Sequence, residues 1–245
     1  MVRYWIVGLT SLFCVSSVFG VSFEEILQKI DQSRAPAESF ATRMMVTFKT
    51  DHKLEKLGLW VRVKHAKKSL VVYTSPPVYK GRVLLMVEDN LWVYIPGTRT
   101  AIRISPQQQL MGQVSNADVA RVVFHLDYQV SSMTPETLNN EPVLKVVLDA
   151  KTKAAAYKTV VMWVKKEGCT PIKATFFALS GRPLKTAYYK HYTSVFGKML
   201  PMLLEIHDHI NSEAVTTIEY TGYELDTTPE SYFQKSYIER VSNGN

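Results

Sequence analysis

The chain has 245 residues, of which 46% are hydrophobic and 21% are charged, and its formal net charge is +7. This length supports one sizeable core, so we expect one domain. The positive charge would suit nucleic acid, but the export segment described next excludes nucleic acid as a partner, and transient contact with an anionic membrane surface or simple solubility accounts for the charge instead.

The first 20 residues have the pattern of a secretory signal peptide. Arg3 supplies the positive start, residues 4–19 are uncharged and largely apolar, and Gly20 is a small residue at the expected cut. Cleavage after Gly20 leaves residues 21–245 as a single domain in the periplasm. A retained membrane anchor is the alternative, although the apolar run is shorter than the roughly 20 residues that a spanning helix needs.

The chain contains two cysteines, Cys14 and Cys169. Acylation of Cys14 would make a lipoprotein, but the preceding Phe13 is too large for that processing site. After signal removal Cys169 is the only thiol, so the mature domain has no intramolecular disulfide. Cys169 lies beside Gly168 and Pro171 in a turn without a nearby base, which indicates a structural thiol.

An amphipathic helix opens the mature chain. Ser22 and Glu25 have the spacing of a capping box, and the apolar residues that follow recur at helical spacing. These apolar residues are Phe23, Ile26, Leu27 and Ile30. The helix is expected to end before Pro36.

The apolar period then changes from helical to alternating, which predicts antiparallel strands. The apolar faces of the first two strands carry Met44, Val46 and Phe48, then Leu57, Leu59, Val61 and Val63. Further strand-like runs span residues 69–74, 82–88, 91–95, 100–104, 143–149, 159–165, 172–179, 184–192, 202–209 and 214–220. The result is a mainly β chain of about ten or eleven strands, and no repeat or linker divides it.

Two segments interrupt this run of strands. Residues 115–118 carry a second capping signal, which predicts a short helix through Phe124. Residues 135–142 begin and end with proline and are predicted to form a loop.

The hairpin around residues 88–91 has two apolar faces. With a two-residue turn at residues 89–90, Met86 lies opposite Val93. One face then carries Val83, Leu85, Val87, Trp92 and Tyr94, and the other carries Leu84, Met86, Glu88, Leu91, Val93 and Ile95. An antiparallel sheet normally exposes one face to water, so the second needs a cover. A filled barrel or half-barrel, a protein partner, and an apolar ligand under a helical lid all remain open.

No catalytic pattern emerges. His207 and His209 share a predicted strand face, but no third metal ligand has a recognisable spacing, so an exposed strand end is the expected interpretation. Ser180 lacks the glycine that a nucleophile elbow places two residues before the serine. We therefore expect no enzyme, no metal and no cofactor. The basic turn at residues 64–68 either binds an anionic head group or acidic partner, or only faces water.

Two blocks of sequence resemble the LolA-like outer-membrane lipoprotein-sorting proteins. The first combines residues 59–63 (Leu-Trp-Val-Arg-Val), 74–77 (Thr-Ser-Pro-Pro), 80–81, 89–96 (Asp-Asn-Leu-Trp-Val-Tyr-Ile-Pro) and 102–104, and the second combines 199–201, 205–209, 217–220 and 237–240. The resemblance implies an unclosed antiparallel β-barrel with a short helical lid, whose concave apolar face takes acyl chains in the periplasm. The family's Gly-Ser-Asp-Phe-like run is replaced here by residues 112–118.

The leading hypothesis is a periplasmic carrier that binds lipoprotein acyl chains or another lipid for transfer toward the outer membrane, and releases them when a lid opens. A non-carrier accessory that docks an envelope transporter or other protein is the alternative, and a lipid-acting hydrolase using residues 207–209 is a third. The predicted cleft residues combine the cleaner apolar strand faces: Met44, Val46, Phe48, Leu57, Leu59, Val61, Val63, Val83, Leu85, Val87, Trp92 and Tyr94.

Overall fold

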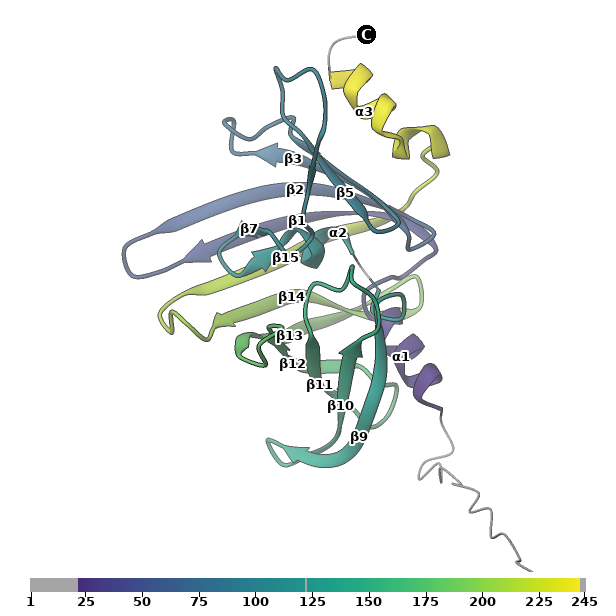
Figure 1. Ribbon diagram of the computed structural model, residues 1–245. Helices are drawn as coiled ribbons and strands as arrows, with labels where there is room; N and C mark the ends of the chain where they lie inside the picture. The colour runs from purple at the N-terminus through teal and green to yellow at the C-terminus, as the bar shows by residue number, and fades with distance from the viewer. Residues whose placement is uncertain (1–21, 122, 243–245) are drawn as a thin grey trace, which may run out of the picture.

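The computed structural model describes residues 22–121 and 123–242 (Figure 1). The predicted signal peptide and Cys14 lie outside these residues. The described helices are α1 (Phe23–Gln32), α2 (Asn116–Ala120) and α3 (Lys235–Ser242), with the 3-10 helix η1 (Glu230–Phe233) before α3. None of them is long and apolar enough to cross a membrane.

Most of the chain forms strands. They are β1 (Ser39–Lys49), β2 (Leu54–Lys64), β3 (Lys68–Ser75), β4 (Val83–Val87), β5 (Asn90–Tyr94), β6 (Ile102–Ile104), β7 (Gln109–Met111), β8 (Val114–Ser115), β9 (Tyr128–Leu138), β10 (Glu141–Ala150), β11 (Thr159–Lys165), β12 (Pro171–Phe177), β13 (Pro183–Val195), β14 (Lys198–Asp208) and β15 (Val215–Leu225). β7 and β8 pair only with each other, and the others form one 13-stranded sheet in the order β6-β5-β4-β3-β2-β1-β15-β14-β13-β12-β11-β10-β9.

The large sheet curls around a concave face without closing, because its edge strands β6 and β9 do not pair with each other (Figure 1). Every neighbouring pair in the sheet is antiparallel. One pairing joins distant parts of the chain: β1 lies beside β15, with Phe40 opposite Leu225. The predicted unclosed antiparallel β-barrel is confirmed.

Helix α1 forms as its sequence predicts. The Ser22 amide donates to Glu25 Oε2 (2.7 Å) and the Glu25 amide donates to Ser22 Oγ (3.2 Å), which completes the capping box. Ile26 and Ile30 are buried, and α1 packs against β9 and β14 at one end of the concave face. The helix ends at Gln32, before Pro36.

The strand count was underestimated, and the predicted loop at residues 135–142 is wrong. β9 continues to Leu138 and β10 begins at Glu141, because Asn139 and Asn140 adopt positive φ and form a two-residue turn. Most β9 side chains are at least partly exposed, so no apolar alternation marks this strand. An edge strand also tolerates Pro135. The second helix is shorter than predicted and ends at Ala120.

The concave face holds the main core, where Val46, Val61 and Leu84 from three strands pack with Val119 of α2. The β4–β5 turn uses residues 88 and 89 rather than the predicted 89 and 90, so Met86 pairs with Leu91. This shift of register is two residues, and because side chains alternate with period two, both sets keep the faces predicted for them.

The convex face of β3–β5 has a cover of its own. Residues 226–242, here called the C-terminal segment, place Phe233 and Ile238 over the side chains of Leu70, Val83, Leu85, Tyr94 and Ala101. The basic turn helps to hold this segment, because Lys64 Nζ donates to the Thr228 carbonyl (2.7 Å) and Lys68 pairs with Glu230.

Candidate functional site

One segment crosses the concave face between the two edge strands (Figure 1). It leaves β6 after Ile104, forms the β7–β8 hairpin and α2, and reaches β9 at Tyr128. We call its described residues, 105–121 and 123–127, the strap. The strap occupies the place of the predicted helical lid, and its residues line a groove beside β2–β6 and a smaller cavity beside β12–β15.

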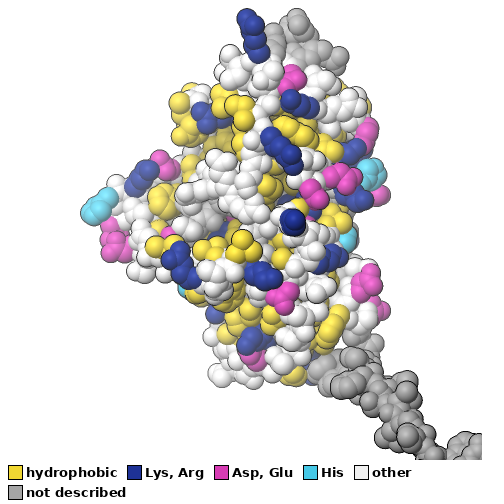
Figure 2. Space-filling model, viewed as in Figure 1, with side chains coloured by type: hydrophobic (Ala, Val, Ile, Leu, Met, Phe, Trp, Pro, Cys, Tyr) yellow, Lys and Arg dark blue, Asp and Glu magenta, His cyan; other side chains and the backbone are white. Residues whose placement is uncertain are grey.

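The groove is the larger of these two spaces. Its volume is about 410 Å³, within the roughly 300–1,000 Å³ that small-molecule sites occupy. Its apolar lining is Leu57, Leu84, Val93, Ile95 and Ile104 from the sheet and Leu110 and Met111 from the strap. Polar side chains complete it: Glu55, Arg82, Gln108, Gln109 and Asn116. On the side of the molecule that the strap crosses, apolar side chains reach the surface between basic ones (Figure 2).

The cavity on the other side of α2 is nearly filled. Its volume is only about 40 Å³, enough for a few water molecules and far too little for an acyl chain. Tyr189, Leu204 and Ile218 contribute apolar lining, whereas Arg34, Arg121 and Lys185 bring three cations to it. The strap therefore closes this half of the concave face.

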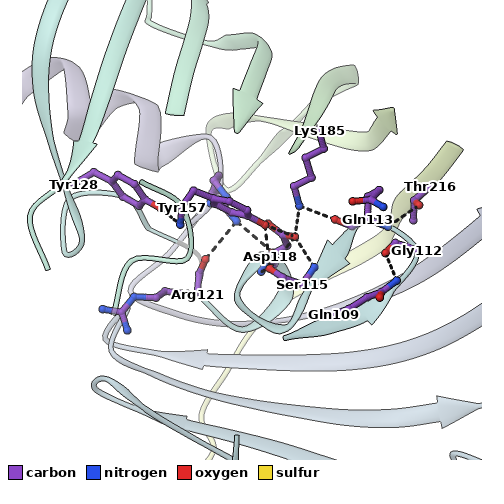
Figure 3. A network of polar contacts seen from close by, with 11 residues as sticks. Gln109, Gly112, Gln113, Ser115, Asp118, Arg121, Tyr128, Tyr157, Lys185 and Thr216 are labelled. Atoms are coloured by element: carbon purple, nitrogen blue, oxygen red, sulfur yellow. Dashed lines mark hydrogen bonds and ion pairs between the residues drawn. The ribbon is translucent and has the colours of Figure 1, made fainter. Parts of the chain in front are cut away.

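A buried ion pair holds α2 (Figure 3). Lys185, on the inner face of β13, is 2% exposed, and its ammonium pairs with the Asp118 carboxylate of α2. The same Nζ donates to the Gln113 carbonyl (2.7 Å), and the Tyr157 hydroxyl donates to Asp118 Oδ1 (3.0 Å). Ser115 caps α2, accepting from the Asp118 amide (3.3 Å). Local capping and a distant strand thus converge on one carboxylate.

The pKa values of this cluster agree with an ionised Asp118. Burial alone would raise the pKa of Asp118, but the charge and hydrogen bond of Lys185, with the bonds from Ser115, outweigh burial and lower it. Burial, followed by the charge of Asp118, raises the pKa of Tyr157 well above its usual value, so the phenol stays neutral and donates.

The tip of the strap rests on β14 and β15. The Gln113 amide donates to Thr216 Oγ1 (3.2 Å) (Figure 3). The Gln113 side-chain amide donates to Asp208. Gly112 has φ of +53°, and a Cβ at this position would collide with Thr216 and Phe48. Only glycine allows the tip to lie this close to the sheet.

Contacts with the β4–β5 turn and with α1 fasten the end of the strap near β9. Arg121, 8% exposed, donates to the Glu88 carbonyl of the turn (2.8 Å), and its pair with the buried Asp127 braces the strap internally. Asp31 of α1 accepts from the His125 amide (2.9 Å) and from His125 Nδ1 (2.8 Å). The hydrogen bond that Asp31 accepts from the His125 ring is the main reason that the pKa of His125 is raised.

Arg34 connects α1 to the strap in a different way. Its Nη2 donates to the carbonyl oxygens of Asp118 and Arg121, each at 3.3 Å. Its guanidinium lies 4.8 Å from the centre of the Phe124 ring. All of these partners belong to the strap.

The predicted cleft residues do not line one cleft, because they lie on opposite faces of the sheet. The inner group is Met44, Val46, Phe48, Leu57, Leu59, Val61 and Val63, and the outer group is Val83, Leu85, Val87, Trp92 and Tyr94. Val61 pairs with Val71, and Val71 pairs with Leu84, so the alternate set of β4 shares the inner face. Of the inner group, Leu57 lines the groove and Met44 lines a minor cavity.

Residues of two kinds are absent from the predicted cleft. Leu84 and Val93 belong to the other face of the β4–β5 hairpin, which also carries Glu88 and is therefore the less uniformly apolar of the two. Lys185 alternates with Ala187 and Tyr189, a pattern that places a cation on an apolar face. That pattern was available in the sequence.

His207 and His209, the two histidines considered as metal ligands, each contact a different side chain. His207 Nε2 lies 2.8 Å from Glu205 Oε1, and His209 Nε2 lies 2.8 Å from Thr186 Oγ1. Within residues 22–121 and 123–242, no group of three or more potential ligands could hold a metal ion. Cys169 is buried, and burial raises the pKa of its thiol.

An unclosed antiparallel sheet whose concave face lies under a strap defines a half-barrel with an internal groove. A LolA superfamily protein from Nitrosomonas europaea has this fold, with a TM-score of 0.84 and 32% identity over 89% of this chain and 99% of that protein. The chain therefore belongs to the LolA superfamily.

Two more solved structures share the fold. A domain described as outer membrane lipoprotein-sorting from Vibrio parahaemolyticus has a TM-score of 0.75 and 18% identity, covering 88% of this chain and 97% of its own. A DUF1329 family protein from Desulfovibrio piger has a TM-score of 0.76 and 18% identity, covering 87% and 96%. A family model described as an uncharacterized protein matches residues 65–240. No curated protein matches the chain.

Proposed function

We propose that the protein is a periplasmic carrier that binds the acyl chains of a lipoprotein, or of another lipid, in the groove for transfer toward the outer membrane. The observation that carries the proposal is a groove with apolar side chains on the sheet and polar ones around them, beside a cover fastened by polar contacts. Membership of the LolA superfamily supports it, as do the likeness to a lipoprotein-sorting domain and the predicted signal peptide.

The energetics suit reversible loading. Burial of ten methylenes stabilises a complex by about 8 kcal/mol, at about 0.8 kcal/mol for each group. A typical hydrogen bond contributes only about 1 kcal/mol net. The burial of an acyl chain in the groove can therefore offset the loss of several hydrogen bonds that fasten the strap. The expected lid releases its ligand by opening; the strap instead would be displaced on loading, and release would follow when it returns to the concave face.

The proposed role is binding and release, without a catalytic step, metal or cofactor. Its partners are acyl chains and, transiently, a membrane surface, with an envelope protein as donor or acceptor. Docking of an envelope transporter through the same apolar floor is the alternative, and it predicts that no lipid accompanies the protein.

Native mass spectrometry of the protein purified gently from its own envelope, followed by organic extraction, tests the proposal. We expect a stoichiometric lipid or acylated protein that is lost from Val93→Glu, because Val93 lines the groove and is only partly buried. Leu179→Glu is the matched control, since Leu179 is 88% exposed and lines neither space. A ligand-free spectrum and failure to take up added lipid would reject the carrier and favour docking.

A further inference from the structure

Among residues 22–121 and 123–242, the polar partners of two cations under the strap all lie on the strap itself. Lys185 Nζ contacts the Asp118 carboxylate and the Gln113 carbonyl, and Arg34 Nη2 contacts the carbonyls of Asp118 and Arg121. Both cations are anchored outside the strap, Lys185 on β13 and Arg34 after α1. Displacement of the strap therefore removes the polar partners of both at once.

The surroundings of Lys185 make such a loss unfavourable. Its ammonium lies 4.9 Å from the centre of the Tyr157 ring and 5.1 Å from that of Phe176, and Ala187 and Tyr189 share its strand face. A cation in apolar surroundings needs a counter-charge, since few water molecules reach it. An entering anionic ligand can supply that charge.

We propose that Lys185 and Arg34 form the head-group part of the lipid site and select an amphiphile with an anionic group, phosphate or carboxylate, at the end of its acyl chains. The inference rests on the proposed function. In the closed state the Asp118 carboxylate stands where the ligand's anion binds. Asn116 lines the groove and Asp118 lines the cavity. Helix α2 therefore lies between the groove proposed for the acyl chains and the cavity proposed for the head group.

One acidic side chain of the sheet competes for Lys185. Asp208 is opposite Lys185 in the register of β13 and β14. In the closed state its two oxygens accept from the Gln113 side chain and from the Ile210 amide (2.7 Å). If Asp208 replaced Asp118 when the strap moves, the site would not discriminate between charged and neutral lipids, and the binding experiment measures this directly.

The test compares three amphiphiles with the same acyl chain, each below its micelle concentration: palmitoyl lysophosphatidylglycerol, palmitate and neutral monopalmitoylglycerol. We expect the full mature protein to bind at least one of the anionic pair roughly tenfold more tightly than the neutral lipid, as one charge-assisted hydrogen bond allows. The tighter of the two anions identifies phosphate or carboxylate as the preferred group. Equal Kd values for all three would reject the head-group site and leave the carrier standing, whereas no binding would reject both.

Variants separate head-group binding from simple fastening of the strap. Lys185→Met should abolish the anionic preference while keeping monopalmitoylglycerol binding, and Lys173→Met, on the convex face, is the control with the same loss of charge. Asp118→Asn should tighten anionic binding more than neutral binding, because it removes the competing carboxylate. If Asp118→Asn instead increases binding of all three equally, the Lys185–Asp118 pair only fastens the strap and the proposal fails.

Discussion

The covers on the two apolar faces of the sheet differ in the buried polar contacts that accompany their apolar packing. The C-terminal segment covers the convex side of β3–β5 by inserting Phe233 and Ile238 into an apolar cluster, with its ion pairs at the margin. The strap also packs apolar side chains such as Val119 against the sheet, but it adds buried polar contacts to other elements, chiefly Asp118 on Lys185 of β13 and the amides of residues 124 and 125 on Asp31 of α1. Apolar packing is non-directional, whereas an ion pair is made or lost as a unit. With the proposed function, the difference leads us to expect a permanent outer cover and a releasable inner one.

The largest effect is expected from the outer cover. Phe233→Ala should lower the free energy of unfolding by about 3 kcal/mol, because it leaves a cavity in the cluster under η1. Urea denaturation measures the change, and Phe196→Ala, at a 47% exposed position, is the control. A loss no greater than that of the control would mean that the C-terminal segment is not part of the stable core.

Removing one partner of the buried Asp118–Lys185 pair should lower the free energy of unfolding, whereas replacing both partners with apolar residues should change it little. Asp118→Ala leaves Lys185 without its counter-charge and is expected to cost about 2–3 kcal/mol, whereas the double variant Asp118→Ala/Lys185→Met should recover most of that loss. The same denaturation assay applies to both proteins. Equal losses in the single and double variants would show that the pair does not hold the strap.

Gly112→Ala should detach the tip of the strap at a cost of about 1–2 kcal/mol, since both the positive φ and the contact with Thr216 and Phe48 oppose a side chain. Hydrogen exchange of strap amides should accelerate while that of β10–β11 stays unchanged. Gly197→Ala is a matched control, because Gly197 also has positive φ (+80°) but a Cβ there would meet no atom within 4 Å. Similar exchange in both variants would contradict a close tip contact.

The smallest effect concerns pH. The pKa of His125 is raised above 6.5, mainly by its hydrogen bond to Asp31, with Asp127 adding to the rise and Lys151 opposing it. A raised pKa stabilises the folded form fully below the unfolded pKa, and this stability is lost as pH rises through the folded value. Exchange at residues 124–127 should therefore accelerate modestly between about pH 6 and 8, beyond the intrinsic effect. The His125→Gln variant should lack this extra pH dependence of exchange. If the dependence persists in that variant, a group other than His125 causes it.

Much of the fold could be predicted because its signals are local. Apolar alternation predicted most strands, and the Ser22–Glu25 capping box predicted α1. β9 was missed because an exposed edge strand has no apolar face to display. The strap had little signal beyond its Ser115 cap, since its position depends on distant side chains such as Lys185 and Asp31.

The candidate site was only partly predictable. A turn of known length relates the two strands of one hairpin, so the two faces of β4–β5 were assigned correctly despite the shift in register. The connection from β3 to β4 is irregular, and β2 and β3 shift register between Gly58 and Leu59. Sequence alone therefore cannot show which side chains of β4 share a face with those of β2. For this reason the predicted cleft combined residues of β4 and β5 on the convex face with residues of β1 and β2 on the concave face.

The pairing of β1 with β15 has a consequence for how the chain folds. Phe40 lies opposite Leu225, so the middle of the sheet is assembled from the first and last of the described strands. The two halves, β1–β6 and β9–β15, can form hairpins independently, but they cannot join until the last strand has been synthesised. Pairing across so long a loop is slow. We therefore expect the sheet to stay incomplete until β15 has been synthesised, a state compatible with the export that we propose.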